Sequence, residues 1–306
     1  MFKARDVSSL ALDAALHAFE FHPHTLHRLR KMARSFCVAR AFARRKKIML
    51  LSRFMSRRLG TSSAIRQAFE KAEQLKDRYG ADNVFDFSIG NPTAPCPAGV
   101  RAALAETERA STPALHGYMD SAGYVEVRTA IAGSLARRFG TPYTADDIIM
   151  TTGAACAINT LMQTVLNPDD EVITLLPSYP AYRVFVENWG AHLVEVPFDG
   201  ETMLPDLAAL ERALSPRTKL VVVNTPNNPS GLVYPPAAAD GIAAALARAE
   251  RAFGHPVLLL SDEPYRDLVY DGAQTPGGLP CMTTRWWCTR SASPPLLPAS
   301  ALAMPR

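Results

Sequence analysis

The sequence predicts an α/β fold in which a mostly parallel sheet is covered by helices on both faces. Short continuous apolar runs such as "LVVV" and "VLLL" have the composition of strands that are buried on both faces. Segments in which apolar residues recur at helical spacing alternate with these runs, as in chains of strand-helix-strand units. At 306 residues, the chain is long enough to bury a substantial core.

The amino-terminal elements precede this alternation. A helix is predicted over "SSAIRQAFEKAEQLKDRYG", with Ser62 or Ser63 as its N-cap and Gly80 at its end. The stretch "VFDFSIGNPTAPCP" alternates apolar and polar residues before a Gly and Pro loop, which predicts a short strand entering a turn. The segment "AGVRAALAETERA" predicts the next helix.

The alternating region then supplies most of the sheet. Strand-then-helix units are predicted over "DDIIMTTGAACAINTLMQTVL" and "DEVITLLPSYPAYRVFVENWG", followed by the strand "HLVEVPF". Helix-then-strand units are predicted over "LPDLAALERALSPRTKLVVVN" and "PAAADGIAAALARAERAFGHPVLLLSD". Ligands of open α/β sheets bind outside the carboxyl ends of the strands. The candidate segments for chemistry are therefore 153–156, 177–182, 224–231 and 262–265.

Composition excludes several classes of protein. Residues 1–58 hold 14 Lys and Arg against 3 Asp and Glu, so the rest of the chain carries −7 within a total of +4. A basic surface for nucleic acid would depend on that segment alone, which has no aromatic interleaving and no binding motif. No apolar run approaches the ~20 residues of a membrane span, and the five Cys lack the paired spacing of disulfides or zinc sites. We expect a cytoplasmic protein without a nucleic-acid partner, membrane span or metal.

Small residues after the first strand of the alternating region point to an anion. "TTGAAC" places Gly153, Ala154 and Ala155 between a predicted strand and the start of a helix. Backbone N–H groups there, together with the helix dipole, favour a phosphate, which small side chains allow to approach. The alternative is an ordinary tight connection.

Two later motifs carry more specific chemistry. "VVVNTPNNPSG" forms a stiff loop that can aim the Asn228 amide at a ligand, although a capped turn is the alternative. In "VLLLSDEPYRDLVY", Asp262 ends a buried strand and Tyr265 follows one helical turn later. A buried carboxylate is costly unless a cation or strong donor meets it, and a protonated pyridine nitrogen would be such a partner. The alternative is that Asp262 caps the next segment.

Six motifs together resemble one family: "DFSIGNPTAP", "YMDSAGYVEVR", "TTGAACAI", "PSYPAY", "NTPNNPSG" and "SDEPYRDLVYDG". The region from about Ser63 to Asp271 is similar to the amino-terminal two thirds of a fold-type I, pyridoxal 5′-phosphate-dependent class I/II aminotransferase. The resemblance implies a role for each matching residue: Gly90 beside the substrate, Tyr118 at the phosphate of the partner subunit, Gly153, Ala154 and Ala155 at the phosphate, Tyr179 stacked on the pyridine ring, Asn228 and Tyr265 on its phenolic oxygen, and Asp262 on its nitrogen. The contribution of Tyr118 to a partner implies a homodimer.

The resemblance also divides the chain. Residues 49–95 correspond to an N-terminal arm and part of a small domain, and residues 96–272 to a partial cofactor-binding large domain. Residues 1–48 are interpreted as a non-native extension, with translation beginning at Met49 or Met55; an Arg-rich organelle transit peptide is the alternative. Residues 273–306 contain no Asp or Glu and are rich in Pro, Ser and Ala, which predicts an aberrant, unstructured tail.

One departure from the family concerns catalysis. The family needs a Schiff-base Lys about thirty residues after Asp262, but this chain has no Lys after Lys219. No catalytic residue is therefore assigned. The neighbouring reading frame combines the third base of each codon with the first two bases of the next. In that frame Trp286-Trp287 encodes Val, and the codons that follow permit "Tyr-Ser-Phe-Ser-Lys", with the Lys encoded across Ala292 and Ser293. We hypothesise a single-base slip between about Thr275 and Cys281, which leaves the carboxyl-terminal part of the fold incomplete.

The resemblance implies transfer of an amino group from an L-amino acid to a 2-oxo acid, impaired in this chain by the missing Lys. Two alternatives stay open. Another fold-type I activity, such as a carbon-sulfur lyase or decarboxylase, would use the same cofactor motifs. A non-catalytic truncated remnant would keep them without turnover.

Overall fold

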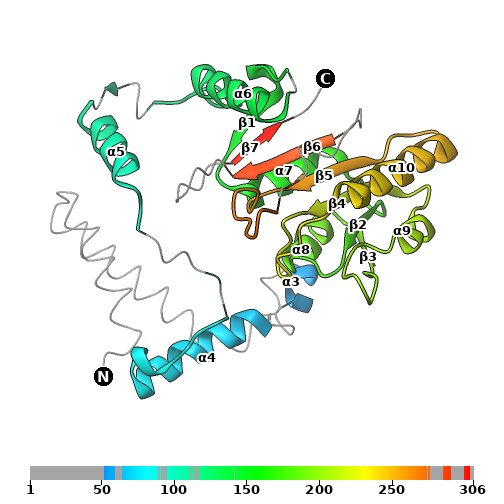
Figure 1. Ribbon diagram of the computed structural model, residues 1–306, viewed down its shortest axis with the longest axis horizontal. Helices are drawn as coiled ribbons and strands as arrows, with labels where there is room; N and C mark the ends of the chain where they lie inside the picture. Colours follow the sequence, from blue (N-terminus) through cyan, green and yellow to red (C-terminus); the bar gives the residue numbers. More distant parts are fainter. Residues whose placement is uncertain are drawn as a thin grey trace. The chain divides into compact units, whose positions relative to one another are not determined.

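The computed structural model describes residues 52–58, 64–88, 90, 95–110, 112–113, 117–140, 142–273, 275, 285–290 and 300–303 (Figure 1). The predicted extension over residues 1–48 and the predicted caps Ser62 and Ser63 lie outside these residues. The chain divides into two units, Met1–Thr93 and Ala94–Arg306, so the division falls close to the boundary predicted between residues 95 and 96.

The first unit contains helices α3 (Arg53–Arg58) and α4 (Ala64–Tyr79) and the short 3-10 helix η1 (Ala81–Asn83). Helix α4 ends at Gly80, which has a φ of 88° and donates its N–H to the Lys76 carbonyl. The strand predicted after this helix is wrong: residues 84–87 belong to no strand, and Phe85 and Phe87 are 84% and 93% exposed. Alternation alone does not make a strand, because the backbone also needs a neighbour to pair with.

The second unit is built around one seven-stranded sheet with the order β1-β7-β6-β5-β4-β2-β3. Strands β2 to β6 pair in parallel, while β7 runs antiparallel to both of its neighbours. The α/β fold with a mostly parallel sheet is therefore confirmed. The strands are β1 (Ile148–Thr151), β2 (Glu171–Leu175), β3 (His192–Val196), β4 (Thr218–Asn224), β5 (Leu258–Asp262), β6 (Arg285–Arg290) and β7 (Ser300–Ala303).

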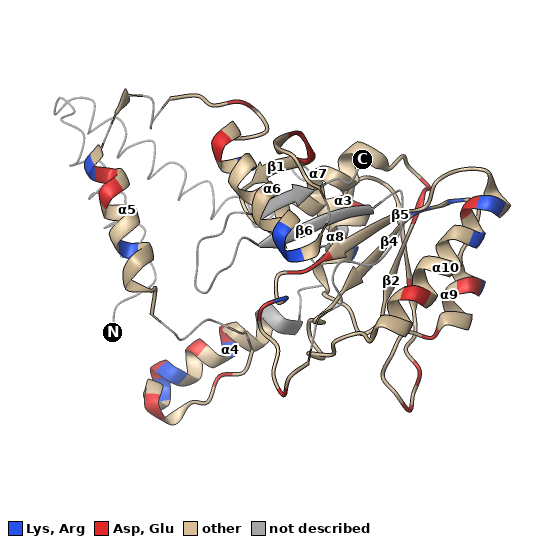
Figure 2. Cartoon of the chain, turned by 45° about the horizontal axis from the view of Figure 1, so that its top comes forward, with Lys and Arg blue, Asp and Glu red and all other residues tan. Residues whose placement is uncertain are grey.

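Helices accompany the strands along the chain. They are α5 (Ala98–Ala110), α6 (Val125–Phe139), the short η3 (Ala145–Asp147), α7 (Ala154–Val165), α8 (Ala181–Glu187), α9 (Leu207–Ala213) and α10 (Pro236–Phe253). In Figure 2, coloured Lys, Arg, Asp and Glu residues lie on helices such as α9 and α10 and on the connecting loops.

The two faces of the sheet bury different sides of the same strands. Within β4, Val221 and Val223 pack in a core with residues of α9 and α10, whereas Leu220 and Val222 pack in a core with residues of α7 and α8. Successive side chains of a strand point to opposite faces, so an uninterrupted apolar run is what a doubly covered strand requires. The prediction of helices on both faces is confirmed.

The tail contributes two strands to this sheet. The prediction that residues 273–306 are unstructured is wrong for Arg285–Arg290 and Ser300–Ala303, which form β6 and β7 between β5 and β1. Strand β6 is rich in aromatic and β-branched residues, which favour strands. Without it, β5 would present a row of unpaired backbone groups.

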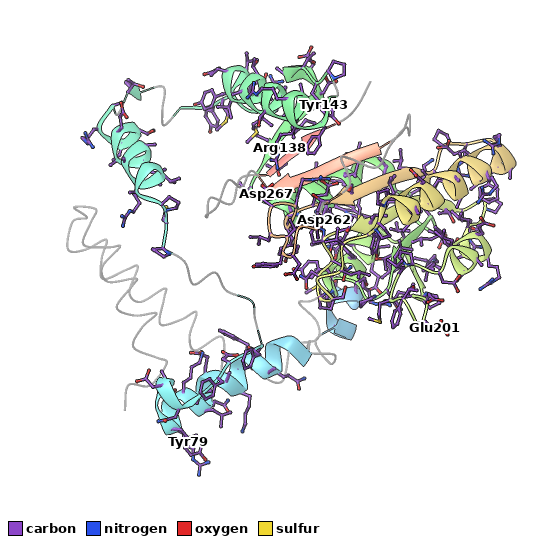
Figure 3. The ribbon with its side chains drawn as sticks, in the orientation of Figure 1. Tyr79, Arg138, Tyr143, Glu201, Asp262 and Asp267 are labelled. Atoms are coloured by element: carbon purple, nitrogen blue, oxygen red, sulfur yellow. The ribbon has the colours of Figure 1, made fainter. Side chains whose placement is uncertain are left out.

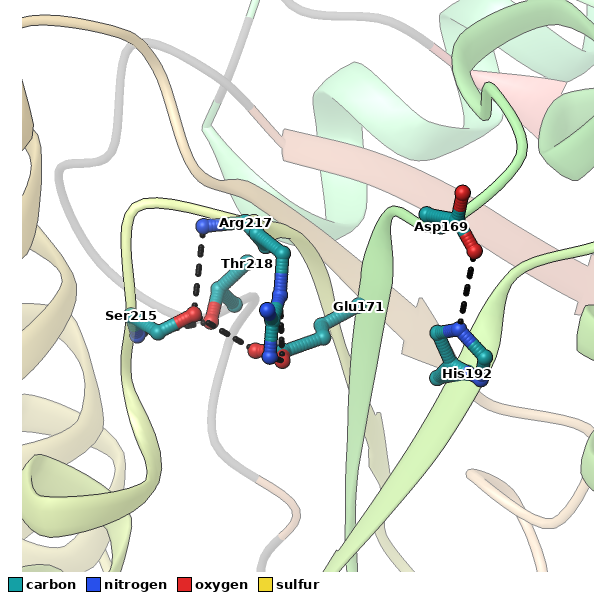
Figure 4. A network of polar contacts seen from close by, with 6 residues as sticks. All are labelled: Asp169, Glu171, His192, Ser215, Arg217 and Thr218. Carbon is teal, nitrogen blue, oxygen red and sulfur yellow. Dashed lines mark hydrogen bonds and ion pairs between the residues drawn. The ribbon is translucent and has the colours of Figure 1, made fainter.

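A network of polar and charged side chains surrounds Glu171, the first residue of β2 (Figure 4). Glu171 lies at the end of the sheet where the parallel strands begin. Its carboxylate accepts a hydrogen bond of 2.6 Å from Ser215 Oγ and one of 2.9 Å from Arg217 Nε. Burial acts to raise the pKa of Glu171, but these donors and the charge of Arg217 outweigh it, so the pKa lies below its ordinary value. The network joins β2 to the loop before β4.

Within the described residues, no helix is both long enough and apolar enough to cross a membrane.

Candidate functional site

The candidate site lies where β4 and β5 end. The two strands pair so that their last residues, Asn224 and Asp262, stand opposite each other. Asp262 is only 5% exposed and is labelled in Figure 3 at the end of β5. The segment that follows Asp262, residues 264–267, is a turn and not a helix. The carboxylate therefore sits at the carboxyl edge of a parallel sheet, where such folds bind ligands.

The Asp262 carboxylate is held by a tyrosine from another element. Tyr182, in α8, donates its hydroxyl to Asp262 Oδ2 at 2.6 Å, and the Tyr182 side chain is buried. A charged acceptor makes this a strong type of hydrogen bond. Tyr182 closes the candidate segment 177–182, but the sequence assigned it no role, because nothing local indicates that its phenol reaches a residue 80 positions away.

Asn224 joins β5 to the loop that follows β4. Its Nδ2 donates to the Asp262 carbonyl oxygen at 2.7 Å, and its Oδ1 accepts from the Asn228 backbone N–H at 2.7 Å. The side chain is buried and uses both ends of its amide. Asn224 opens the candidate segment 224–231, but the sequence assigned it no role of its own; the available signal was a polar residue at the end of an otherwise apolar strand.

The loop after β4 is stiffened by Asn227. Its Nδ2 donates to the Pro177 carbonyl at 3.0 Å, and its Oδ1 accepts from the Ser230 N–H and hydroxyl at 3.1 and 2.8 Å. The next residue, Asn228, donates from Nδ2 to Tyr265 Oη at 3.2 Å. The structure therefore brings together two of the predicted site residues, Asn228 and Tyr265. The Asn228 amide and the Tyr265 hydroxyl lie next to each other.

The predicted phosphate turn begins α7. Gly153 has a φ of 97°, a conformation in which a side chain would be strained. Its carbonyl accepts from the N–H groups of Cys156 and Ala157 at 3.1 and 3.2 Å. Ala154 and Ala155 occupy the first turn of this 12-residue helix, where the N–H groups point along the axis toward its positive end.

The remaining predicted residues differ in how they relate to this edge. Tyr179, 38% exposed, packs its ring edge-to-face against Tyr182, with centroids 5.6 Å apart and an interplanar angle of 89°. Tyr118 lies before α6 and is fully exposed, with a relative exposure of 109%. Gly90 belongs to the first unit, so its contribution stays a prediction.

A second buried acidic residue follows Asp262. Glu263 is 3% exposed, accepts a hydrogen bond of 2.6 Å from Ser261 Oγ and forms an ion pair with Arg266. The Arg266 guanidinium also lies over the Phe139 ring, 4.7 Å from its centroid. Nearby, Arg138 and Asp267 form a partly exposed ion pair that connects α6 to the same turn (Figure 3). These contacts tie the segment after β5 to α6.

The residues at this edge fit a phosphorylated pyridine. They offer a buried carboxylate for a cationic ring nitrogen, an amide and a phenol for a ring oxygen, and helix N–H groups for a phosphate. No lysine follows Lys219 in the sequence, and Lys219 itself lies five residues before Asn224, roughly 16 Å away along an extended strand. Among the residues that the structure describes, no group of His, Cys, Asp and Glu is arranged to hold a metal ion.

Comparison with known proteins gives a family match over more than half of the chain. The family model described as "Aminotransferase class I and II" matches residues 82–292. A probable aspartate/prephenate aminotransferase of Thermus aquaticus is 39% identical over 204 residues, 66% of this chain and 51% of the relative. The arginine–pyruvate transaminase of Pseudomonas aeruginosa is 32% identical over 209 residues, 67% of this chain and 50% of the relative.

Solved structures give the same result. An amino transferase from Eubacterium rectale matches with a TM-score of 0.77 and 37% identity, covering 83% of this chain and 65% of that chain. The aspartate aminotransferase of Thermus thermophilus with maleate matches with a TM-score of 0.69 and 30% identity, covering 83% and 64%. The chain spans about half the length of the curated relatives that it matches.

Proposed function

Because this chain belongs to the class I and II aminotransferases, a pyridoxal phosphate-dependent family, we propose that its carboxyl sheet edge binds pyridoxal 5′-phosphate. We propose that the activity of its lineage is transfer of an amino group from an L-amino acid to a 2-oxo acid. The observation that carries the proposal is the buried Asp262 carboxylate, fixed by Tyr182 and Asn224 beside the Asn228–Tyr265 pair. A carboxylate buried in this way is suited to a cationic ring nitrogen.

Each predicted residue has a place in this proposal. When bound, the cofactor supplies an electron-withdrawing ring for the bond that breaks at the substrate. Asp262 keeps the ring nitrogen protonated, and Asn228 and Tyr265 bind the phenolic oxygen. The N–H groups of Gly153, Ala154 and Ala155 bind the phosphate, Tyr179 stacks on the ring, and Gly90 borders the substrate.

We further propose that the protein is a homodimer in which Tyr118 reaches the phosphate of the partner subunit. Tyr118 and the adjacent Met119 are exposed, as are Val125 and Val127 at the start of α6. Neighbouring exposed apolar side chains are typical of surfaces that bind another protein. Sedimentation velocity of the full chain should give the mass of two copies, and a concentration-independent monomer would refute the dimer.

Catalysis in this chain is impaired in our proposal, because the Schiff-base Lys is missing. Strand β6 runs parallel to β5 with Cys288 opposite Asp262, so β6 ends at the same edge as the site. A Lys encoded across Ala292 and Ser293 in the neighbouring frame would follow this strand; those two residues lie outside the described part of the chain. The absence of a Lys after Lys219 motivates the proposed slip in the reading frame, which resequencing of the gene from codon 275 to codon 293 tests. A neighbouring frame without a Lys codon there would refute it.

A binding experiment tests the function itself. The full chain and a frame-corrected chain are incubated with pyridoxal phosphate, reduced with borohydride and mapped by mass spectrometry. We expect both chains to retain the cofactor. Only the corrected chain should show the cofactor linked covalently to a Lys that follows Asp262. Asp262→Asn should weaken retention in both, while the matched control Asp267→Asn, at the partly exposed ion pair, should not. Equal retention by Asp262→Asn and wild type would refute the proposed site.

Turnover separates the two alternative functions. A corrected chain that releases a 2-oxo acid only when a second 2-oxo acid accepts the amino group is an aminotransferase. Release of carbon dioxide or of a thiol would indicate the decarboxylase or lyase alternative, and cofactor binding without any turnover would indicate a non-catalytic remnant.

A further inference from the structure

Tyr182 is a phenol inside an otherwise apolar core. Its side chain is 1% exposed and packs with α7 and with the apolar residues of β2, β4 and β5. Its only polar atom, the hydroxyl oxygen, reaches the end of β5 and donates to Asp262 Oδ2 at 2.6 Å. A Phe would fill the same space, so packing alone does not account for the hydroxyl.

The hydrogen bond restricts the direction of the Asp262 carboxylate. Asn224 already holds the Asp262 carbonyl oxygen at 2.7 Å, so main chain and side chain of Asp262 are each fixed by a different residue. Rotation of the carboxylate would break its bond to Tyr182 while the group remains buried, which is costly.

The same tyrosine supports Tyr179. The edge of one ring meets the face of the other at 5.6 Å, a favourable arrangement for two aromatic side chains. Tyr179 is partly exposed, whereas Tyr182 is buried. The residue proposed to stack on the ring and the residue proposed to bind its nitrogen therefore share one buried support.

We propose that Tyr182 is a positioning residue that orients Asp262 toward the ring nitrogen of the cofactor. It acts through Asp262 and does not touch the cofactor. The inference rests on the proposed function. It requires that loss of the hydroxyl weakens binding only of ligands that contain a ring nitrogen.

The experiment compares two probes on the full chain. Pyridoxamine 5′-phosphate contains the ring nitrogen, and its carbocyclic analogue has a C–H group in that place. Calorimetry gives the affinity of each probe for wild type, Tyr182→Phe and the control Tyr234→Phe. Tyr234 is a good control because it is 3% exposed but packs with α9 and α10 on the other face.

We expect Tyr182→Phe to weaken binding of pyridoxamine phosphate about tenfold, the size of one lost hydrogen bond to a charged group, and to leave the analogue unchanged. Tyr234→Phe should change neither affinity. An equal loss for both probes would mean that Tyr182 only packs, and would overturn the inference while the proposed function stands. If wild type binds neither probe, the proposed function fails and the inference falls with it.

A gentler variant covers a failure of Tyr182→Phe to fold. Tyr182→3-fluorotyrosine keeps the ring and hydroxyl but makes the phenol more acidic, which alters its bond to Asp262. We expect at least about a twofold change in the affinity for pyridoxamine phosphate and none for the analogue. No change for either probe would overturn the inference.

Discussion

Replacing Asn224 by Ala tests whether one amide holds the site edge together. The substitution removes two hydrogen bonds of 2.7 Å, one to the Asp262 carbonyl and one from the Asn228 N–H. Both partners are backbone groups: the Asp262 carbonyl ends β5, and the Asn228 N–H belongs to a half-buried residue in the loop after β4. Asn224 itself is only 5% exposed. Ala cannot replace either bond.

The magnitude follows from the two backbone groups that lose their partner. Each such group costs about 1–3 kcal/mol when buried, so two cost about 2–6 kcal/mol, and about 3 kcal/mol is taken as a working value because the Asn228 end is only half-buried. For a domain of this size, about 3 kcal/mol lowers the melting temperature by roughly 6–12 °C. Because Asp262 and Asn228 also lose a support, the affinity for pyridoxal phosphate should fall as well.

Urea denaturation followed by circular dichroism measures the effect. The midpoint should fall while the slope with denaturant stays the same, which marks a change in stability and not in the denatured state. Asn167→Ala is the control, because Asn167 is exposed and its loss should cost less than about 0.5 kcal/mol. A loss for Asn224→Ala as small as that of the control would refute the bridging role.

Three further substitutions test other parts of the structure. Glu171→Gln should cost about 1 kcal/mol of stability near neutral pH. Because the pKa of Glu171 is lower in the folded state than its ordinary value of 4.5, the carboxylate stabilises the fold above pH 4.5, and this stabilisation is lost as the pH falls through the folded-state pKa. Acid should therefore destabilise wild type more than the variant. Arg266→Met should cost about 3–5 kcal/mol by leaving the Glu263 carboxylate buried without its ion pair, and adding Glu263→Gln should recover part of the loss. Gly123→Ala should cost about 2–3 kcal/mol, because φ is 97° and the new Cβ would lie 2.6 Å from Met150 Cγ and 2.8 Å from Met150 Cβ. Met150→Ala removes Cγ but keeps Cβ, so it should relieve only part of the contact and none of the backbone strain.

Each of these effects is measured by denaturant titration, and each has an outcome that contradicts it. An unchanged pH dependence of stability in Glu171→Gln would show that this carboxylate does not govern acid sensitivity. A double variant of Arg266 and Glu263 no more stable than Arg266→Met alone would exclude the ion pair as the cause. Full recovery by Met150→Ala would exclude backbone strain at Gly123.

The central sheet could be predicted because its signal is local. Strands β4 and β5 are covered on both faces, so their sequences are continuously apolar, and the polar residue that ends each run marks the site edge. Asn228, Tyr265 and Asp262 follow directly from these strand ends. The pairing of Asn228 with Tyr265 agrees with a shared role, although that role remains a proposal.

The missed features depend on contacts between distant segments. Strands β6 and β7 could not be recognised from a tail without acidic residues, because their stability comes from the backbone groups of β5 and β1. The strand predicted around Phe85 does not form for the opposite reason: its residues alternate as in a strand, but no strand in the described part of the chain pairs with them. The hydroxyl of Tyr182 could not be placed either, because α8 had first to be packed against the sheet.

The position of β6 and β7 also has a consequence for synthesis of the protein. Among the strands that the structure describes, β1 is the first to leave the ribosome, yet its neighbour in the sheet is β7, which follows all the others. Until residues 285–303 have been translated, β1 and β5 both expose open edges that can pair with strands of other chains. We expect stalled or prematurely terminated nascent chains to aggregate, and holdase chaperones to engage this protein late in translation.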